Sequence, residues 1–208
     1  MKTALITACL GGIDLPRNHV KQNIDVSVFQ FDDNNYPPRV SMKPRIQAKT
    51  VRMFGWEFAP GFDYYIWIDS SFRMCKENST QWLIDMCGDK DIAFFKHPIR
   101  NTPQEEKECL EKSMNEPYIS ARYKNEIYNP DWFGNYTLFA TGIIIYKPTD
   151  IVKTMMKEWF FQVARYHSND QLSLSSIVVN MNIPYALIDK NIYRTEYFKH
   201  YGHSLLCA

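Results

Sequence analysis

Apolar residues recur along this chain in short runs that polar or turn-forming residues interrupt. Runs rich in β-branched and aromatic residues predict buried strands. Stretches in which apolar residues recur every three or four positions predict amphipathic helices. The predicted strands cover residues 3–10, 25–31, 64–68, 91–95, 138–146 and 185–188. The predicted helices cover residues 44–54, 79–86, 103–112, 149–165 and 170–179.

Strands and helices alternate along most of the chain, which favours an α/β fold with a mainly parallel sheet and right-handed crossovers. A length of 208 residues suits one domain with a large core. The clearest helix, 149–165, carries apolar residues at i+4 steps. They are Ile151, Met155, Trp159 and Val163. This stripe indicates core packing rather than a cofactor site.

Composition narrows the class of protein. Hydrophobic residues make up 45% of the chain and aromatic residues 15%, which is typical of a globular protein and not of a disordered one. The aromatic share suits a thick core, and also a site that stacks bases or sugars. The net charge of +1 argues against a tight, non-specific grip on nucleic acid, although it leaves room for a local basic groove.

Several kinds of site and segment find no support in the sequence. The five cysteines are scattered without CxxC spacing, so they indicate neither a zinc knuckle nor a disulfide framework, and reduced thiols are expected. No apolar run reaches the length of a membrane span or resembles a signal peptide. The GxGxxG, P-loop, GxSxG and HExxH motifs are absent.

The most informative segment is 62–71, in which a strand of large apolar residues ends abruptly in Asp69, Ser70 and Ser71. In an open α/β sheet, ligands bind at the carboxyl ends of the strands. An aspartate delivered to that edge is suited to holding a divalent metal on a diphosphate. The alternative is a strand-ending aspartate that only caps the next turn.

Two groups of basic residues are candidates for binding phosphate or sugar. One is a face of the helix 44–54, where three cations recur at i, i+4 and i+7, and the other follows the strand 91–95. They are Arg45, Lys49 and Arg52 on the helix, and Lys96, His97 and Arg100 after the strand. Guanidinium and ammonium groups bind phosphate well. For both groups the alternative is an ordinary solvated surface.

Acidic and imidazole candidates lie in the last third of the chain. Ser168 and Gln171 have the spacing of a capping box, while Asp170 between them could serve as a base or orient a sugar hydroxyl. His200 and His203 lie three residues apart and could share a face, and histidine is a good ligand for Mn²⁺-class metals. The alternative for these histidines is a polar chain terminus.

Taken together and in order, these segments resemble the glycosyltransferase-like domain family, once filed as a domain of unknown function, whose plant members are tied to seed mucilage and pollen development. The matching segments are 45–49, 62–71, 96–100, 159–163 and 168–173, with a weaker match at the tail. The resemblance implies a GT-A-like fold, with a nucleotide-binding half over residues 1–100 and an acceptor half and C-terminal tail over residues 101–208.

The resemblance also implies roles for individual residues. Asp69 would bind the metal, and by analogy with GT-A enzymes in general His200 or His203 would complete that site. The residues expected to bind the nucleotide or the donor sugar are Thr7, Ala8, Asp32, Asp33, Arg45, Lys49, His97 and Arg100. Asp170 and Gln171 would face the sugar near the reacting carbon. Position 71 is serine where the common DxD pattern has a second carboxylate, which allows binding that depends less on metal.

The expected function is therefore transfer of a hexosyl or pentosyl group from a nucleotide-sugar, UDP-linked, to an acceptor hydroxyl with the help of Mn²⁺ or Mg²⁺. The acceptor is a glycan, a small molecule or modified viral DNA, and the expected location is the cytoplasm of a microbe or virus-infected cell. If the enzyme inverts, Asp170 is the base; if it retains, Asp170 or Gln171 orients the sugar. The alternatives are a nucleotide- or sugar-binding module without turnover, and a nucleotidyltransferase.

Overall fold

The computed structural model describes residues 1–12, 14, 17–113 and 127–202. Its centre is a six-stranded sheet with the order β2-β1-β3-β6-β5-β7. The strands are β1 (Thr3–Cys9), β2 (Val26–Asp32), β3 (Tyr64–Ile68), β5 (Ile92–Lys96), β6 (Phe139–Tyr146) and β7 (Tyr185–Ile188). Only β6 runs antiparallel to its neighbours in this sheet, so the other strands all point the same way. A second, two-stranded sheet pairs β4 (Phe72–Met74) with β8 (Phe198–His200).

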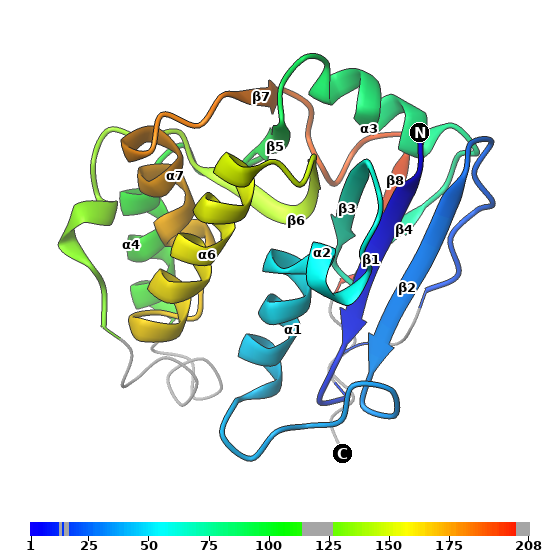
Figure 1. The fold of residues 1–208 in the computed structure, drawn as a ribbon. Coiled ribbons are helices and arrows are strands. Elements are labelled where there is room, and N and C mark those ends of the chain that lie inside the picture. Colours follow the sequence, from blue (N-terminus) through cyan, green and yellow to red (C-terminus); the bar gives the residue numbers. More distant parts are fainter. Residues whose placement is uncertain (13, 15–16, 114–126, 203–208) are drawn as a thin grey trace.

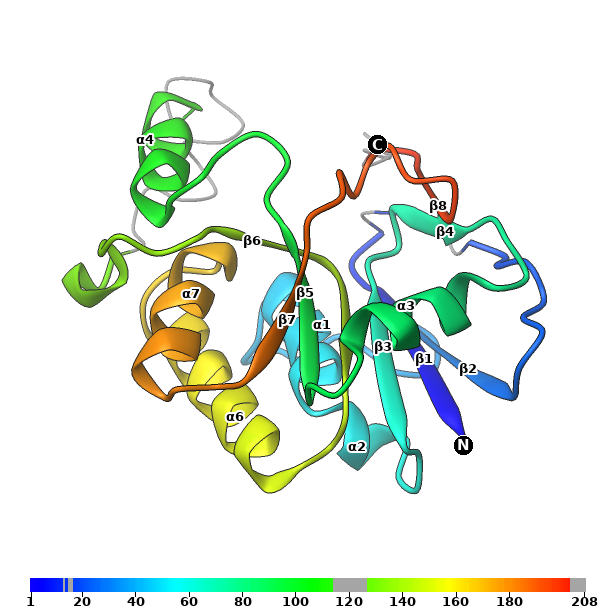
Figure 2. The ribbon, with the colours of Figure 1, turned by 90° about the horizontal axis from the view of Figure 1, so that it is seen from above.

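The helices cover both faces of the central sheet (Figure 1). The described helices are α1 (Pro44–Met53), α2 (Gly55–Phe58), α3 (Ser79–Cys87), α4 (Pro103–Ser113), η1 (Pro130–Trp132), α6 (Asp150–Arg165) and α7 (Gln171–Asn180). α1, α6 and α7 pack on one face, whereas α3 and the β4–β8 sheet lie on the other (Figure 2). α4 stands farther out and packs against α7 (Figure 2).

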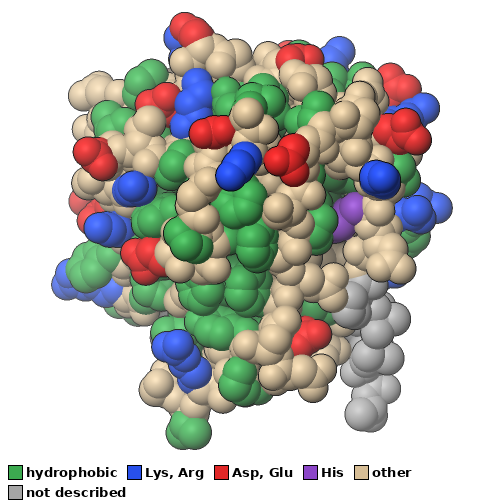
Figure 3. Space-filling view, turned by 45° about the vertical axis from the view of Figure 1, so that its right-hand side comes forward, with side chains coloured by type: hydrophobic (Ala, Val, Ile, Leu, Met, Phe, Trp, Pro, Cys, Tyr) green, Lys and Arg blue, Asp and Glu red, His purple; other side chains and the backbone are tan. Residues whose placement is uncertain are grey.

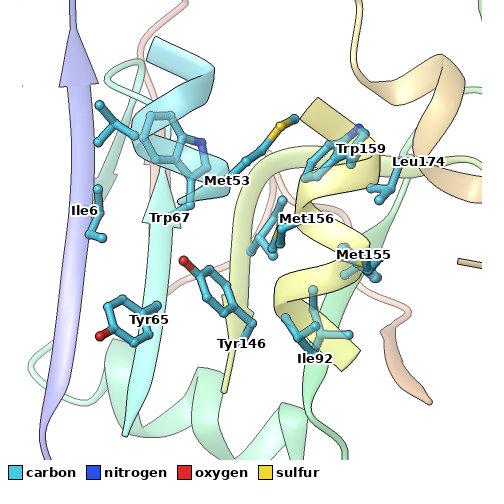
Figure 4. Close-up of a cluster of buried hydrophobic side chains, with 14 of the residues drawn as sticks. Ile6, Met53, Tyr65, Trp67, Ile92, Tyr146, Met155, Met156, Trp159 and Leu174 are labelled. Carbon is cyan, nitrogen blue, oxygen red and sulfur yellow. The ribbon is translucent and has the colours of Figure 1, made fainter. Parts of the chain in front are cut away.

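Alternation along each strand builds a separate core on each face of the sheet. Ile6, Tyr65 and Trp67 point toward α1 and α6, whereas Leu5 and Ile66 point toward α3. Figure 4 shows the first of these cores, in which methionines and tryptophans fill the space between the sheet and α6. The inner strands β1, β3, β5 and β6 are therefore buried on both faces, which explains why they are almost continuous apolar runs in the sequence.

The α/β fold predicted from the sequence, with a mainly parallel sheet flanked by helices, is confirmed. Every predicted strand and helix is present with its ends within one residue of the prediction. The antiparallel direction of β6 and the short elements α2, η1, β4 and β8 were not predicted. In α6, Ile151 is exposed and Val152 takes its place in the buried stripe.

Surface properties agree with the near-neutral composition. On the face shown in Figure 3, Lys and Arg side chains are interspersed with Asp and Glu rather than gathered. The four cysteines that the structure describes form no disulfide bond with one another. Within the described ranges, none of the helices combines the length and the apolar character needed to cross a membrane.

Candidate functional site

A pocket of about 380 Å³ opens where β1 and β3 end and β6 begins. β1 and β3 run parallel, so their carboxyl ends meet at one edge of the sheet, where α/β proteins bind ligands. Residues from six segments line it, among them Ala8, Asp14, Arg45, Lys49, Arg52, Asp69, Thr141, Asn169, Asp170, Gln171, Tyr193 and His200. The pocket thus unites the ends of β1 and β3, one face of α1, the start of β6, the loop before α7 and the C-terminal region.

Both carboxylate oxygens of Asp170 accept hydrogen bonds on the pocket wall. Its side chain is only 6% exposed, and its Oδ2 accepts hydrogen bonds from the Lys49 ammonium and the Arg52 guanidinium. Its Oδ1 accepts a hydrogen bond of 3.0 Å from the Thr141 hydroxyl. Lys49 and Arg52 lie three residues apart on α1, so the basic helix face predicted from the sequence does face this pocket.

The charges in this cluster shift one another's pKa values. Burial alone would raise the pKa of Asp170, but the positive charges of Arg52 and Lys49 outweigh burial and hold that pKa well below its usual range. Burial lowers the pKa of the Lys49 ammonium, while the negative charge of Asp170 opposes that effect. An ionised carboxylate with both oxygens engaged is a weak proton acceptor, which suits Asp170 to orienting neighbours more than to acting as a base.

Asp69 follows the last residue of β3, as predicted, and it is more open than Asp170. Its Oδ1 accepts hydrogen bonds from Arg52 Nη2 at 2.9 Å and from Trp67 Nε1 at 2.7 Å, and its side chain is 29% exposed. Gly142 on β6 leaves room beside the other oxygen, because a Cβ there would lie 3.5 Å from Asp69 Oδ2 and 2.8 Å from the Phe72 ring. Because Arg52 donates to Asp69 through Nη2 and to Asp170 through Nη1, its guanidinium bridges the two carboxylates.

Two tryptophans of the aromatic core donate hydrogen bonds to Asp69 and Asp170. Trp67 and Trp159 are buried members of the core between the sheet and α6 (Figure 4). The Trp67 indole donates to Asp69, and the Trp159 indole donates to the Asp170 carbonyl oxygen at 3.0 Å. The guanidinium of Arg52 lies 4.8 Å from the Trp67 ring centroid, a cation–π distance. Two tryptophans of the core therefore hold Asp69 and Asp170 by hydrogen bonds.

Asp14, which was not predicted, brings a further carboxylate to the wall. It lies in the connection between β1 and β2, and its Oδ2 accepts a hydrogen bond of 2.8 Å from the Ser70 hydroxyl. Ser71 is buried and its carbonyl accepts from the Tyr201 amide at 2.9 Å. The only sequence signal for Asp14 is its place shortly after the Gly11-Gly12 turn that follows β1. Thr141, Asn169 and Tyr193 were likewise not predicted as wall residues.

Three residues predicted to bind the nucleotide lie elsewhere than on this wall. Thr7 is buried within β1, although its neighbour Ala8 does line the pocket. Both carboxylate oxygens of Asp33 accept from the Gly11 amide, at 2.9 and 3.0 Å. Asp32 Oδ1 accepts from the backbone amides of residues 34 and 35, at 2.9 and 3.1 Å. These two aspartates hold loops at the end of β1 and β2 in shape.

His97 and Arg100, predicted to line the donor sugar, lie behind the pocket. His97 Nδ1 accepts from the Arg100 amide at 2.9 Å, and burial followed by the Arg100 charge lowers the His97 pKa to about 4. The Arg100 side chain donates to Glu106, whose other oxygen accepts from Asn169 Nδ2 at 2.9 Å. Both residues are therefore linked to the pocket wall through Glu106 and Asn169.

The start of α7 differs in detail from the predicted capping box. The helix begins at Gln171, which lines the pocket, and the residue before it is Asp170. The N-cap is Asp170, whose side chain makes no capping bond, and the Gln171 amide donates to Asn169 Oδ1 at 3.2 Å. Asn169, Asp170 and Gln171 together form one edge of the pocket.

Of the residues predicted to hold a metal, Asp69 and His200 both line the pocket. The His200 ring packs against Phe72 and Tyr193, with centroid distances of 4.6 and 4.8 Å. His203 lies outside the described residues. Among the residues that the structure describes, no three His, Cys, Asp or Glu side chains group closely enough to hold a metal ion.

Comparison with known proteins adds a likeness of fold. No protein-family model matches this chain, and no curated protein matches it in sequence. Among solved structures, the chain is similar to a glycosyltransferase involved in the glycosylation of the major capsid of PBCV-1. The two are 10% identical over 96% of this chain and 92% of that chain, with a TM-score of 0.49. At this identity the likeness does not extend to individual site residues.

Proposed function

We propose that this protein is a glycosyltransferase that moves a sugar from a nucleotide-sugar donor, UDP-linked, to an acceptor hydroxyl. The observation that carries the proposal is the charged wall at the carboxyl edge of the sheet, where Arg45, Lys49 and Arg52 face one pocket beside Asp69. The leaving group of such a donor is a nucleoside diphosphate. Stabilising its developing negative charge is the main electrostatic requirement of the reaction, and Arg45 together with a divalent cation held by Asp69 would meet it.

The neighbouring residues divide the remaining tasks. Arg45 lies on the wall one turn before Lys49, and we assign to it the most direct contact with the diphosphate. Lys49 and Arg52 are ion-paired with Asp170, and Arg52 also with Asp69, so these carboxylates hold both cations in place and balance their charge. Asp170 and Gln171 face the donor sugar in this arrangement. The low pKa of Asp170 favours a role in orientation over that of a general base.

A divalent cation, Mn²⁺ or Mg²⁺, is part of the proposal. Asp69 would hold it through the oxygen that Arg52 and Trp67 leave unengaged, and His200 would be the second ligand. The bound cation would add positive charge beside the leaving diphosphate. Because the described wall supplies few ligands, phosphate oxygens of the donor have to complete the coordination. Cation binding is therefore expected to depend on the nucleotide.

The acceptor is a glycan, a small molecule or modified DNA, and two other functions compete with glycosyl transfer. A binding module would hold the donor without turnover, and a nucleotidyltransferase would join a sugar phosphate to a nucleotide with release of pyrophosphate. The products distinguish the three.

The experiment is to incubate the protein with a panel of UDP-sugars, with and without Mn²⁺, and to measure UDP. A parallel incubation with UTP and sugar 1-phosphates is assayed for pyrophosphate. We expect UDP release that falls strongly in Asp69→Asn and is unchanged in Asp189→Asn, an exposed aspartate away from the pocket. Pyrophosphate release instead would support nucleotidyl transfer. Donor binding without any UDP release from the whole panel would contradict the proposal and favour the binding module.

A further inference from the structure

Glu106 is a buried carboxylate on a helix whose neighbouring acidic residues are exposed. α4 stands apart from the sheet and packs on α7 (Figure 2), and Glu106 is 3% exposed whereas Glu105 and Glu108 lie in solvent. Burying a carboxylate is costly unless charged or hydrogen-bonding partners satisfy it. Its partners therefore indicate what this residue does.

The two oxygens of Glu106 join the rear of the pocket to its wall. One accepts from Arg100 Nε, and the other accepts from Asn169 Nδ2 at 2.9 Å. An ionised carboxylate only accepts hydrogen bonds, so it selects the NH₂ end of the Asn169 amide. The carbonyl end of that amide is thereby turned toward the Gln171 amide, 3.2 Å away.

Arg100 is itself held in place by His97. The Arg100 amide donates to His97 Nδ1 at 2.9 Å, its Nη2 lies 3.3 Å from His97 Nε2, and its Nη1 donates to Cys109 Sγ at 3.6 Å. The low pKa of His97 keeps that ring neutral, so it does not repel the guanidinium. The polar residues that follow β5 therefore act on the pocket through Glu106 and do not line it.

We propose that Glu106 is a positioning residue: by fixing the Asn169 amide it sets the Asn169–Gln171 edge of the pocket against the donor sugar. This inference rests on the proposed glycosyl transfer. Asn169 is buried and lines the pocket. Its backbone amide also donates to His167 Nδ1 at 3.0 Å. A small displacement of a positioned group is enough to slow a reaction strongly.

The first test is Glu106→Gln, which keeps the shape of the side chain. A glutamine can accept from Arg100 or from Asn169 but turns an NH₂ group toward the other. We expect kcat for UDP-sugar turnover to fall about ten-fold or more, while KM changes less than about three-fold because the cations on α1 are untouched. Glu108→Gln, the same change on the exposed side of α4, is the control and should leave both constants unchanged.

A reciprocal pair of substitutions separates positioning from helix docking. Asn169→Asp alone places a second carboxylate against that of Glu106, so we expect a lower kcat than that of wild type. Combining it with Glu106→Gln restores one donor and one acceptor with their roles exchanged, and we expect kcat to recover about ten-fold relative to Asn169→Asp. If the double variant is no faster than Asn169→Asp while remaining folded, the positioning role is overturned.

Amide hydrogen exchange at Gln171 gives a readout that needs no activity. The Gln171 N–H is protected by Asn169 Oδ1, so its exchange should accelerate in Glu106→Gln and stay unchanged in Glu108→Gln. Unchanged exchange in Glu106→Gln overturns the inference even if the enzyme is active. Accelerated exchange in a protein that turns over no UDP-sugar would uphold the link to Gln171 while removing the proposed function.

Discussion

Two polar clusters meet at the step from Asn169 to Asp170, one on the pocket wall and one behind it. The front cluster consists of Lys49, Arg52, Asp69 and Asp170, and the rear cluster consists of His97, Arg100, Glu106 and Asn169. Both join segments that are far apart in the sequence. They differ in the number of charged groups and in access to the pocket.

The residues of the front cluster line the pocket, whereas His97, Arg100 and Glu106 do not. In the front cluster two cations balance two carboxylates, Arg45 stands beside them, and Asp69 remains 29% exposed. In the rear cluster one guanidinium and one carboxylate are paired, and the histidine is neutral because burial lowers its pKa to about 4. We infer that the charged residues of the front cluster bind the ligand and that those of the rear cluster hold the wall residue Asn169 in position.

The largest expected effect is loss of stability when the front cluster loses its central anion. Asp170→Ala leaves Lys49 and Arg52 buried without their shared carboxylate, which should cost about 3–5 kcal/mol of unfolding free energy. Urea unfolding measures this, with Asp189→Ala as an exposed control that should change stability by about 0.5 kcal/mol or less. A loss in Asp170→Ala no larger than in the control would show that the cluster does not depend on Asp170.

Crowding the open side of Asp69 should affect both stability and binding. In Gly142→Ala the new methyl group would lie 2.8 Å from the Phe72 ring and 3.5 Å from Asp69 Oδ2. We expect a loss of about 1–3 kcal/mol from overpacking, together with weaker Mn²⁺-dependent UDP binding. Thermal unfolding and calorimetric titration check the two effects. Unimpaired UDP binding in this variant would argue against Asp69 Oδ2 as a ligand-binding atom.

The rear cluster should make stability depend on pH between about 6.5 and 4. Because burial and the Arg100 charge lower the His97 pKa from 6.5 to about 4, the unfolded chain takes up the proton first as the pH falls. Stability is therefore highest above pH 6.5 and declines toward pH 4. We expect wild type to lose about 1–2 kcal/mol more than His97→Gln over this range, after allowing for solvent screening. Parallel slopes for the two proteins would contradict the assignment.

The smallest expected effect on stability is that of Asp69→Asn. An amide carbonyl can still accept from Arg52 and Trp67, and the side chain is partly exposed, so the change should stay within about 1 kcal/mol. Its effect on UDP binding in Mn²⁺ should be much larger than its effect on folding. A variant that is strongly destabilised yet binds UDP normally would reverse the distinction drawn between Asp69 and Asp170.

Sequence pattern predicts the elements of this fold well because strands buried on both faces and amphipathic helices each leave a strong periodic signal. It also predicts the position of Asp69 at the sheet edge, since a carboxylate that ends an apolar strand has to leave the core. The i, i+4 and i+7 spacing of Arg45, Lys49 and Arg52 likewise predicts the basic face of α1. These features depend on residues close together in the chain.

Partners that come from distant segments escape this reasoning. Asp32 and Asp33 look like ligand carboxylates, yet neither lines the pocket. Asp32 accepts from the amides of the turn that follows it, a common use of aspartate, and Asp33 accepts from the Gly11 amide of another loop. Glu106 reads as a surface residue of a polar helix, although it meets Asn169 across a sequence separation of 63 residues. Asp14 meets Ser70 in the same way, 56 residues away. Only the packed structure reveals such pairs.

The central claim, that the front cluster and Arg45 bind the diphosphate of a nucleotide, is tested most directly by calorimetric titration with UDP and with uridine in the presence of Mn²⁺. We expect UDP to bind about ten-fold or more tightly than uridine, a difference that shrinks in Arg45→Gln and persists in Lys157→Gln, an exposed position on α6. Equal affinities for UDP and uridine, or no binding of either, would contradict the account.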